Sequence, residues 1–153
     1  MSNYDIKNLS SFNLDTTNNL KLTNSNFPNK FAVLFFYPKD NTPGCSTENE
    51  DFNTILHHFE KANCTVFGIS PDSIKSHEKF KLKLKLNFEL VSDPDNSFSK
   101  IFDVYKLKKM YGREYMGIER STFLFKNKKI IKEWRKVKVN GHASEVLDYI
   151  NNL

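Results

Sequence analysis

FAVLFFYPKDNTPGCSTENEDF, residues 31–52, is the stretch that decides the fold. Its first seven residues, 31–37, are apolar or aromatic, and their length and Phe/Val content predict a strand buried on both faces. Pro38 ends this run. Thr42 and Pro43 then signal a helix start, with a hydroxyl available for the N-cap and a proline at the first helical position. The stretch therefore predicts a buried strand that leads through a short loop into a helix.

A single cysteine, Cys45, falls in the first turn of this expected helix. Its sulfur there faces backbone N–H groups that have no partner within the helix, at the positive end of the helix dipole. Such surroundings lower the pKa of a thiol and favour the reactive thiolate. Phe52, Ile55, Leu56 and Phe59 follow at helical spacing and predict an amphipathic continuation. Cys45 is therefore the first candidate for a reactive residue.

Length and composition indicate one compact protein. The chain has 153 residues, of which 39% are hydrophobic, and 14 phenylalanines can fill its core. We expect one domain over residues 1–153, which buries roughly 70% of the surface of the unfolded chain. No apolar stretch approaches the ~18 residues of a membrane span, and residues 1–11 lack a signal-peptide pattern. Cys45 and Cys64 are too few for a disulfide framework. We therefore expect a cytoplasmic protein with free thiols and no membrane contact.

Two features raise the question of another kind of binding. The net charge is +5, and basic residues are densest in KFKLKLKL (79–86) and WRKVKVNG (134–141). These lysines alternate with apolar residues, as in a half-buried element with one solvated face, and no nucleic-acid-binding motif accompanies them. His57 and His58 are adjacent, so they lie on different faces of a helix, without a ligand pattern nearby. We expect no nucleic acid, metal or cofactor.

The remaining chain predicts alternating strands and helices. Residues 11–24 predict an N-terminal hairpin or edge element around an Asn-rich turn. Further elements are strands at 64–70 and near 88–92, a helix starting after Asp72 or Ser73, helices over 97–105 and 142–150, and a hairpin around Asn127 over 121–134. The segment 81–86 fits strand alternation as well as a helix end. This order predicts an α/β fold, with a central mixed sheet and helices on both faces.

Three strings resemble a peroxiredoxin of the bacterioferritin-comigratory or PrxQ type. They are FYPKDNTPGCSTE (36–48), YMGIERSTFLF (115–125) and WRKVKVNGHASEVLDYI (134–150). The family signature is a proline, three residues, a threonine or serine, two residues and a cysteine, together with a distant arginine. The residues at these positions are Pro38, Thr42, Cys45 and Arg120. The resemblance implies a thioredoxin-like fold and a thiol-dependent peroxidase.

The resemblance also implies a role for each signature residue. Cys45 would attack the terminal oxygen of a peroxide as a thiolate and become a sulfenic acid. Arg120 would donate charge-assisted hydrogen bonds to the thiolate and to the peroxide oxygens. Thr42 would orient the peroxide through its hydroxyl, and Pro38 would shield the sulfur from water. The peroxide is thus the expected substrate.

Supporting roles are expected for Gly44 and Glu48. The Gly44 amide would add a donor at the helix start, and Glu48 matches a carboxylate that the family commonly carries near the arginine. Structural explanations stand beside the chemical ones, because Thr42 also suits an N-cap, Pro38 a strand end, and Glu48 the first turn of a helix. Only the resemblance pairs Arg120 with the cysteine.

Recycling is where the sequence departs from many PrxQ-type members. They carry a resolving cysteine five residues after the reactive one, where this chain has Glu50. Cys64 begins an expected central strand, a position typical of a buried apolar residue. We therefore expect a one-cysteine mechanism, with thioredoxin, glutaredoxin and glutathione, or another thiol as the reductant. The preferred peroxide stays open, and we expect a monomer or a weak homodimer.

Two other functions compete with the peroxidase. A noncatalytic thioredoxin-fold binding or redox-sensing module is favoured by the missing resolving cysteine but opposed by the complete signature. A thioredoxin-type dithiol oxidoreductase needs a C-x-x-C pair, whereas this chain has Cys45-Ser-Thr-Glu48. The peroxidase is therefore the preferred hypothesis.

Overall fold

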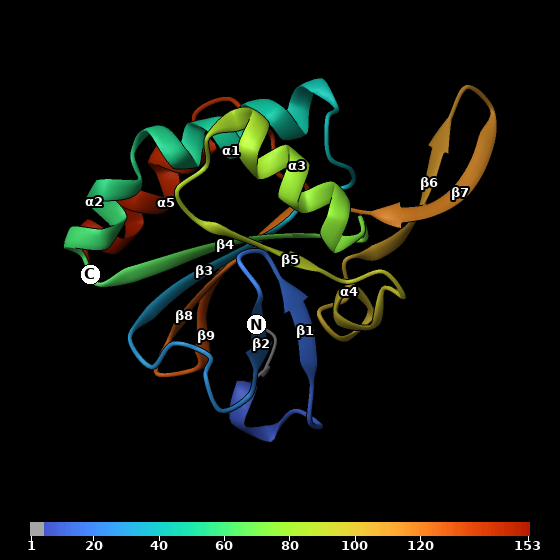
Figure 1. The fold of residues 1–153 in the computed structure, drawn as a ribbon. Coiled ribbons are helices and arrows are strands. Elements are labelled where there is room, and N and C mark those ends of the chain that lie inside the picture. Colours follow the sequence, from blue (N-terminus) through green and yellow to red (C-terminus); the bar gives the residue numbers. More distant parts are fainter. Residues whose placement is uncertain (1–4) are drawn as a thin grey trace.

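The computed structural model describes residues 5–153, and its centre is a seven-stranded mixed sheet (Figure 1). The strand order is β2-β1-β5-β4-β3-β8-β9, in which β3, β4 and β5 are parallel and the other pairings are antiparallel. The strands of this sheet are β1 (Asn13–Thr16), β2 (Leu20–Thr23), β3 (Phe31–Phe36), β4 (Cys64–Ser70), β5 (Glu89–Ser92), β8 (Ser121–Lys126) and β9 (Lys129–Trp134). The structure confirms the predicted mixed sheet, its N-terminal hairpin and the hairpin around Asn127.

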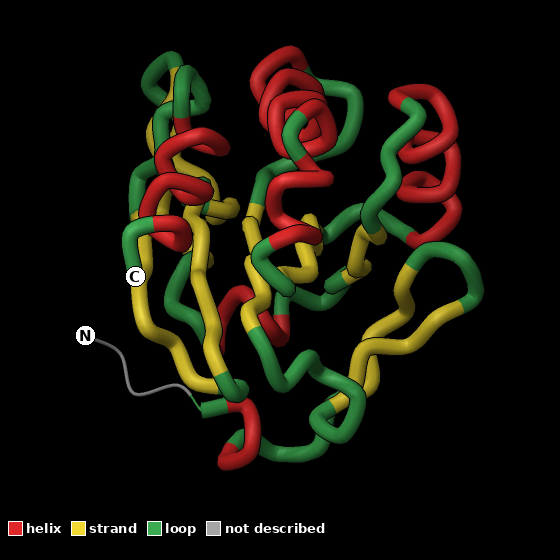
Figure 2. The backbone as a smooth tube through the Cα atoms, turned by 90° about the vertical axis from the view of Figure 1, so that its left-hand side faces the viewer, coloured by secondary structure: helices red, strands yellow, loops and turns green. Residues whose placement is uncertain are grey.

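Helices cover both faces of the sheet, but unevenly (Figure 1). One face carries α1 (Pro43–Thr54), α2 (Leu56–Lys61), α3 (Ile74–Leu84) and α5 (His142–Asn151), which form the helical layer above the sheet in Figure 2. The other face packs against the short α4 (Ser97–Ile101) and the 3₁₀ turn η1 (Ile6–Asn8), and Leu14 and Leu22 of the N-terminal hairpin join the same apolar cluster. None of the helices in residues 5–153 is long and apolar enough to cross a membrane.

The apolar run of β3 supplies both sides of the core. Val33 and Phe35 pack into the cluster under the helical layer, whereas Leu34 and Phe36 pack into the cluster on the opposite face. All four side chains are buried. Because successive residues of a strand point to opposite faces, a strand covered on both sides must be apolar throughout.

One helix differs from the sequence expectation, and the end of another settles an ambiguity that the sequence leaves open. The helix after β3 is interrupted at Ile55, whose backbone ends α1 and precedes α2. The segment 81–86, which also fitted a strand, continues α3 to Leu84, and Lys85 ends the helix in the left-handed conformation with φ of 55°. Ser73 caps α3 by accepting a hydrogen bond from the backbone of Ser76.

The structure contains a separate two-stranded sheet that the sequence does not predict. β6 (Tyr105–Met110) and β7 (Arg113–Ile118) pair around a turn at Tyr111 and Gly112 and project from the body of the molecule (Figure 1). The expected helix over 97–105 correspondingly ends at Ile101. The hairpin side chains are mostly exposed, so hydrophobic alternation does not mark a buried face. Gly112, with φ of +75°, is the local signal for its turn.

Candidate active site

The first turn of α1 holds Cys45, which is only 1% exposed. Thr42 is the N-cap residue and Pro43 occupies the first helical position, as the sequence predicts. The Thr42 hydroxyl does not cap the helix, however, and it donates to the carbonyl of Lys39 at 2.8 Å. Cys45 therefore has the expected helix-start setting, while the Thr42 side chain binds back onto its own loop.

Arg120 lies between β7 and β8 and reaches Cys45 across 75 residues of sequence. Its Nη2 donates to Cys45 Sγ at 3.4 Å, and its Nη1 donates to Glu48 Oε1 at 2.6 Å. Glu48 follows Cys45 by three residues in α1, so both side chains lie on one face of the helix. The planar guanidinium thus joins the thiol to a buried carboxylate.

Gly44 provides the space that this arrangement needs. A Cβ atom at this position would lie 3.3 Å from Arg120 Nη2, which is tighter than ordinary van der Waals contact. A side chain on residue 44 would therefore press on the guanidinium. From the sequence, Gly44 is expected only to provide a backbone N–H donor. Its lack of a side chain, which leaves room for Arg120, becomes apparent only in the tertiary structure.

The remaining signature residues are placed by the loop rather than by hydrogen bonds to the sulfur. Pro38 is the half-buried residue that follows Tyr37 at the end of β3, and Thr42 ends the loop three residues before Cys45. Among the described residues, hydrogen bonds join Cys45, Arg120 and Glu48 into one cluster. The position of Pro38 and Thr42 relative to that cluster depends on the conformation of residues 38–42.

Glu48 is under opposing electrostatic influences. Burial raises its pKa from 4.5 to about 7, and this effect outweighs the attraction of Arg120, which lowers it. Its second oxygen, Oε2, is buried and has no hydrogen-bond partner among residues 5–153. One guanidinium therefore faces two acids, and ionised Glu48 competes with a Cys45 thiolate for the same positive charge.

A second polar cluster lies under the loop, formed by Asp40, Asp72 and His77. Each residue offers one possible metal-ligand atom, and these three atoms lie within 4.8 Å of one another, a spacing that a metal ion could bridge. Asp40 already accepts hydrogen bonds from protein side chains through both oxygens, and Asp72 Oδ2 accepts from Ser70 Oγ at 2.6 Å. The cluster is therefore arranged as a hydrogen-bond network, and sequence reasoning did not find it.

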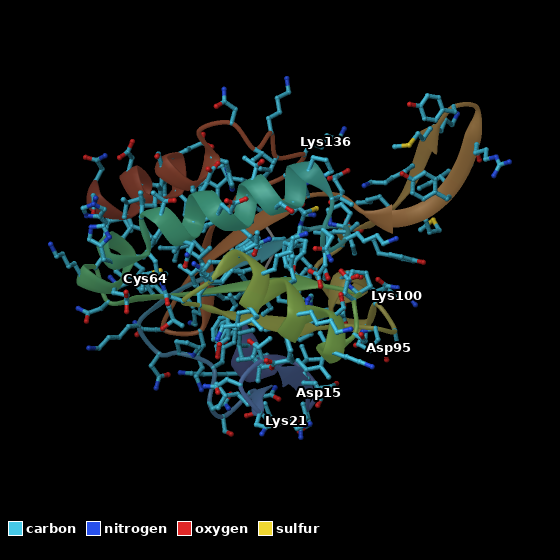
Figure 3. The ribbon with its side chains drawn as sticks, turned by 45° about the horizontal axis from the view of Figure 1, so that its top comes forward. Asp15, Lys21, Cys64, Asp95, Lys100 and Lys136 are labelled. Atoms are coloured by element: carbon cyan, nitrogen blue, oxygen red, sulfur yellow. The ribbon has the colours of Figure 1, made fainter. Side chains whose placement is uncertain are left out.

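Cys64 lies at the other end of the sheet. It starts β4 opposite Phe31, the first residue of β3. Cys45 instead lies beyond the other end of β3, after Phe36 and the loop that leads into α1. Five residues of strand alone span about 17 Å at ~3.3 Å each. Figure 3 shows Cys64 at the end of the molecule away from the β6–β7 hairpin that precedes Arg120. The structure thus separates the two thiols.

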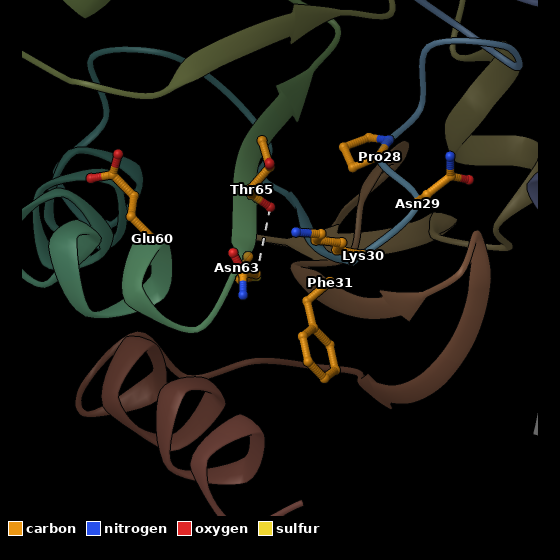
Figure 4. Close-up of a pocket in the computed structure, with 8 residues that line it drawn as sticks. Pro28, Asn29, Lys30, Phe31, Glu60, Asn63 and Thr65 are labelled. Carbon is orange, nitrogen blue, oxygen red and sulfur yellow. Dashed lines mark hydrogen bonds between the residues drawn. The ribbon is translucent and has the colours of Figure 1, made fainter.

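The surroundings of Cys64 suppress thiol chemistry. The residue is 3% exposed, and burial raises its pKa to about 12. Its Sγ lies 3.8 Å from the carbonyl oxygen of Thr65, beside a hollow of about 470 Å³ that Lys30, Phe31 and Asn63 also line (Figure 4). This hollow belongs to the end of the sheet opposite the Cys45 cluster.

Comparison with known proteins places these features in context. A family model described as the AhpC/TSA family matches residues 7–134. Peroxiredoxin Bcp of Bacillus subtilis is 49% identical over 130 residues, which cover 84% of this chain and 83% of that protein. Peroxiredoxin Bcp of Xanthomonas campestris is 53% identical over 118 residues, which cover 76% and 74%.

Solved structures agree with the sequence matches. The X. campestris bacterioferritin comigratory protein, studied for its alkyl peroxide reduction activity, gives a TM-score of 0.87 at 44% identity, covering 92% of this chain and 90% of that one. A Xylella fastidiosa PrxQ variant gives the same TM-score at 48% identity, covering 92% and 88%. The likeness extends over most of the chain and includes the thioredoxin-like fold.

Replacing Glu48 with glutamine should change how stability depends on pH. The raised pKa means that the folded protein holds a proton on Glu48 between about pH 4.5 and 7 that the unfolded chain releases. The stability linked to this proton is complete below pH 4.5 and is lost as pH rises through 7. Glu48→Gln keeps an acceptor oxygen but cannot ionise. Its free energy of unfolding, relative to wild type, should therefore rise by about 2–3 kcal/mol between pH 5 and 8.

Urea denaturation at pH 5, 6, 7 and 8 measures this difference. Glu50→Gln is the matched control, because Glu50 is exposed on the same helix. The difference between this control and wild type should stay nearly constant with pH. A constant difference for Glu48→Gln as well would contradict the raised pKa.

Proposed function

The chain belongs to the AhpC/TSA family and is a peroxiredoxin of the Bcp/PrxQ type, a thiol-dependent peroxidase, and we propose that Cys45 is its peroxidatic residue. The observation that carries this proposal is the 3.4 Å contact between Arg120 Nη2 and the Cys45 sulfur at a helix start. Family membership also favours the enzyme over a noncatalytic thioredoxin-fold module.

The first half of the reaction is a two-electron transfer from sulfur to the peroxide. The Cys45 thiolate attacks the terminal oxygen of the hydroperoxide, so that an S–O bond forms while the O–O bond breaks. The departing oxygen carries the electron pair and takes up a proton to leave as an alcohol or water. Sulfur is thereby oxidised to a sulfenic acid. Negative charge develops on the departing oxygen, and the Arg120 guanidinium is the cation within reach that stabilises it.

Thr42 has a specific orienting role in this scheme. Its hydroxyl proton is used by the carbonyl of Lys39, so the lone pairs of its oxygen remain available as acceptors. The O–H of a hydroperoxide can donate to that oxygen while the backbone N–H groups of Gly44 and Cys45 face the peroxide from the helix start. Pro38, which has no N–H, would cover the sulfur without competing for these hydrogen bonds.

The proposed substrates are hydrogen peroxide and organic hydroperoxides. The work on the X. campestris relative concerns alkyl peroxide reduction, which supports the organic class. In the second half of the reaction, an external thiol attacks the sulfenic sulfur, releases water and forms a mixed disulfide that a second thiol reduces. The reductant is thioredoxin, glutaredoxin with glutathione, or another thiol. The remote, high-pKa Cys64 supports this one-cysteine route.

Three further proposals concern the whole protein. We infer that residues 1–153 form one domain, because the sheet incorporates strands from Asn13 to Trp134 and α5 packs against α1. We also infer that the protein works in the cytoplasm, in line with its free thiols. A monomer or weak homodimer is the proposed assembly.

Removing the reactive sulfur should abolish peroxide turnover. Cys45→Ser keeps the size of the side chain but is a far poorer nucleophile, so consumption of peroxide with an added thiol should fall to the level without enzyme. Cys64→Ser is the matched control and should keep its activity, because its sulfur lies at the other end of the sheet. Turnover by Cys45→Ser at the wild-type rate would refute the assignment.

Changing the guanidinium to an ammonium should slow the reaction with peroxide. Arg120→Lys keeps a positive charge but loses the fork that contacts Cys45 and Glu48 together. The second-order rate constant, measured by competition with horseradish peroxidase, should fall by about 10- to 100-fold. Arg113→Lys, on the exposed hairpin, should leave the rate unchanged. Equal rates for wild type and Arg120→Lys would argue against this role.

Oxidised protein should contain no bond between Cys45 and Cys64 within one chain. A disulfide needs Cα atoms within about 7 Å, whereas the intervening strand alone spans about 17 Å. After one equivalent of peroxide and addition of glutathione, peptide mapping without reduction should recover a mixed disulfide at Cys45. High recovery of an intramolecular Cys45–Cys64 peptide would show that the one-cysteine route is wrong.

A further inference from the structure

A buried carboxylate holds the loop that carries the signature proline and threonine. Asp40 lies in the middle of residues 38–42 and is only 4% exposed. Its Oδ1 accepts from the hydroxyl of Tyr37 at 2.7 Å, and its Oδ2 accepts from Ser76 Oγ at 2.8 Å and from His77 Nδ1 at 2.8 Å. One side chain therefore ties the loop to the end of β3 and to the first turn of α3.

The backbone of the same residue is tied to a third segment. The Asp40 N–H donates to Asp72 Oδ2 at 2.8 Å, and Asp72 lies in the turn between β4 and α3. Asn41 then turns the chain in the left-handed conformation, with φ of 66°, directly before Thr42. The anchor is thus two residues from the hydroxyl that is proposed to receive the peroxide.

His77 is a deeply buried partner of this anchor. Its ring is completely buried, and its Nε2 lies 2.9 Å from the carbonyl oxygen of Val91 while its Nδ1 lies 2.8 Å from Asp40 Oδ2. A carbonyl oxygen only accepts hydrogen bonds, so Nε2 carries the hydrogen of its contact with Val91. A second hydrogen lies between Nδ1 and the carboxylate of Asp40. A buried hydrogen bond therefore joins the imidazole to the carboxylate.

The anchor and the thiol depend on different contacts. Cys45 is held by α1, whose Phe52 ring stacks on Phe35 with a centroid distance of 4.5 Å. Arg120 is held by Glu48 and by the start of β8. Loss of the anchor would therefore displace the loop residues while leaving the sulfur and the guanidinium in place.

We propose that Asp40 and His77 are positioning residues for peroxide reduction, because their buried pair fixes the loop that aims Thr42 and Pro38 at the Cys45 sulfur. This inference rests on the proposed function of Cys45. It predicts that disrupting the pair slows the reaction with peroxide, which needs the oriented loop. Alkylation by iodoacetamide does not need the oriented loop, so it should not be slowed.

Replacing His77 with glutamine or asparagine, two amides of similar size, should remove one of the two hydrogen bonds of the ring and keep the other. Asparagine places its amide where Nδ1 lies, and glutamine places its amide where Nε2 lies. His77→Gln therefore keeps the contact with Val91 and loses that with Asp40, whereas His77→Asn keeps the contact with Asp40. The second-order rate constant of His77→Gln with hydrogen peroxide should fall by about 10- to 100-fold, since small displacements of orienting groups have effects of this size. His77→Asn should restore most of the rate.

The controls distinguish a displaced loop from a general loss of folding or of thiol reactivity. Mass spectrometry should show that iodoacetamide alkylates Cys45 at least as fast in both variants as in wild type, and circular dichroism should show that both are folded. If His77→Gln does not fold, Ser76→Ala removes one donor to Asp40 and should give the same selective loss to a smaller extent. Equal loss in both reactions, an unchanged peroxide rate, or a His77→Asn variant as slow as His77→Gln would overturn the proposal. Failure of the underlying function is distinguishable, because wild-type protein itself would then not react with peroxide.

Discussion

The antiparallel pairing of β3 with β8 is the constraint on which the site depends. Phe36, the last residue of β3, lies opposite Ser121, the first residue of β8. The chain that leaves β3 toward Cys45 and the residue that enters β8, Arg120, are therefore brought to the same end of the sheet. A slip by one residue would move Arg120 by ~3.3 Å and turn every buried side chain of β8 to the wrong face. The burial of both strands on both faces thus fixes the distance between sulfur and guanidinium.

The sharing of one guanidinium by two acids gives the site its electrostatic character. Arg120 contacts Glu48 with one nitrogen and Cys45 with the other, so the carboxylate fixes the orientation of the fork that faces the sulfur. The same carboxylate competes for the positive charge when it is ionised. In the proposed reaction, conversion of the Cys45 thiolate to a neutral sulfenic acid would remove one of the two anions and leave Glu48 as the sole acidic partner. Oxidation of the sulfur and protonation of Glu48 are therefore coupled through Arg120.

The sequence predicts the parts of this structure that depend on local pattern or on burial along a whole element. Residues 31–36 and 64–70 are strands because their apolar runs fit a strand covered on both faces, and Thr42 and Ser73 mark the starts of helices. The β6–β7 hairpin escapes prediction because its exposed strands carry no buried face. Proximity of Arg120 to Cys45 depends on strand order, which no local pattern encodes, so only the family resemblance pairs them. Asp40 and His77 escape for a related reason, since no local pattern shows that a loop carboxylate and a residue on a later helix are partners.

Burial of the Cys45 sulfur places different demands on the two halves of the proposed cycle. Cys45 is only 1% exposed, so in the proposed cycle a peroxide of a few atoms needs far less space to reach the sulfur than a protein partner does. A protein thiol must bring its own sulfur to about 2 Å, the length of a disulfide bond, so the chain around Cys45 has to open first. The contacts that resist opening are the Asp40 anchor and the packing of α1 on β3. The rigidity that orients the peroxide therefore opposes reduction of the sulfenic acid by a large partner, and it favours a small thiol as the direct reductant.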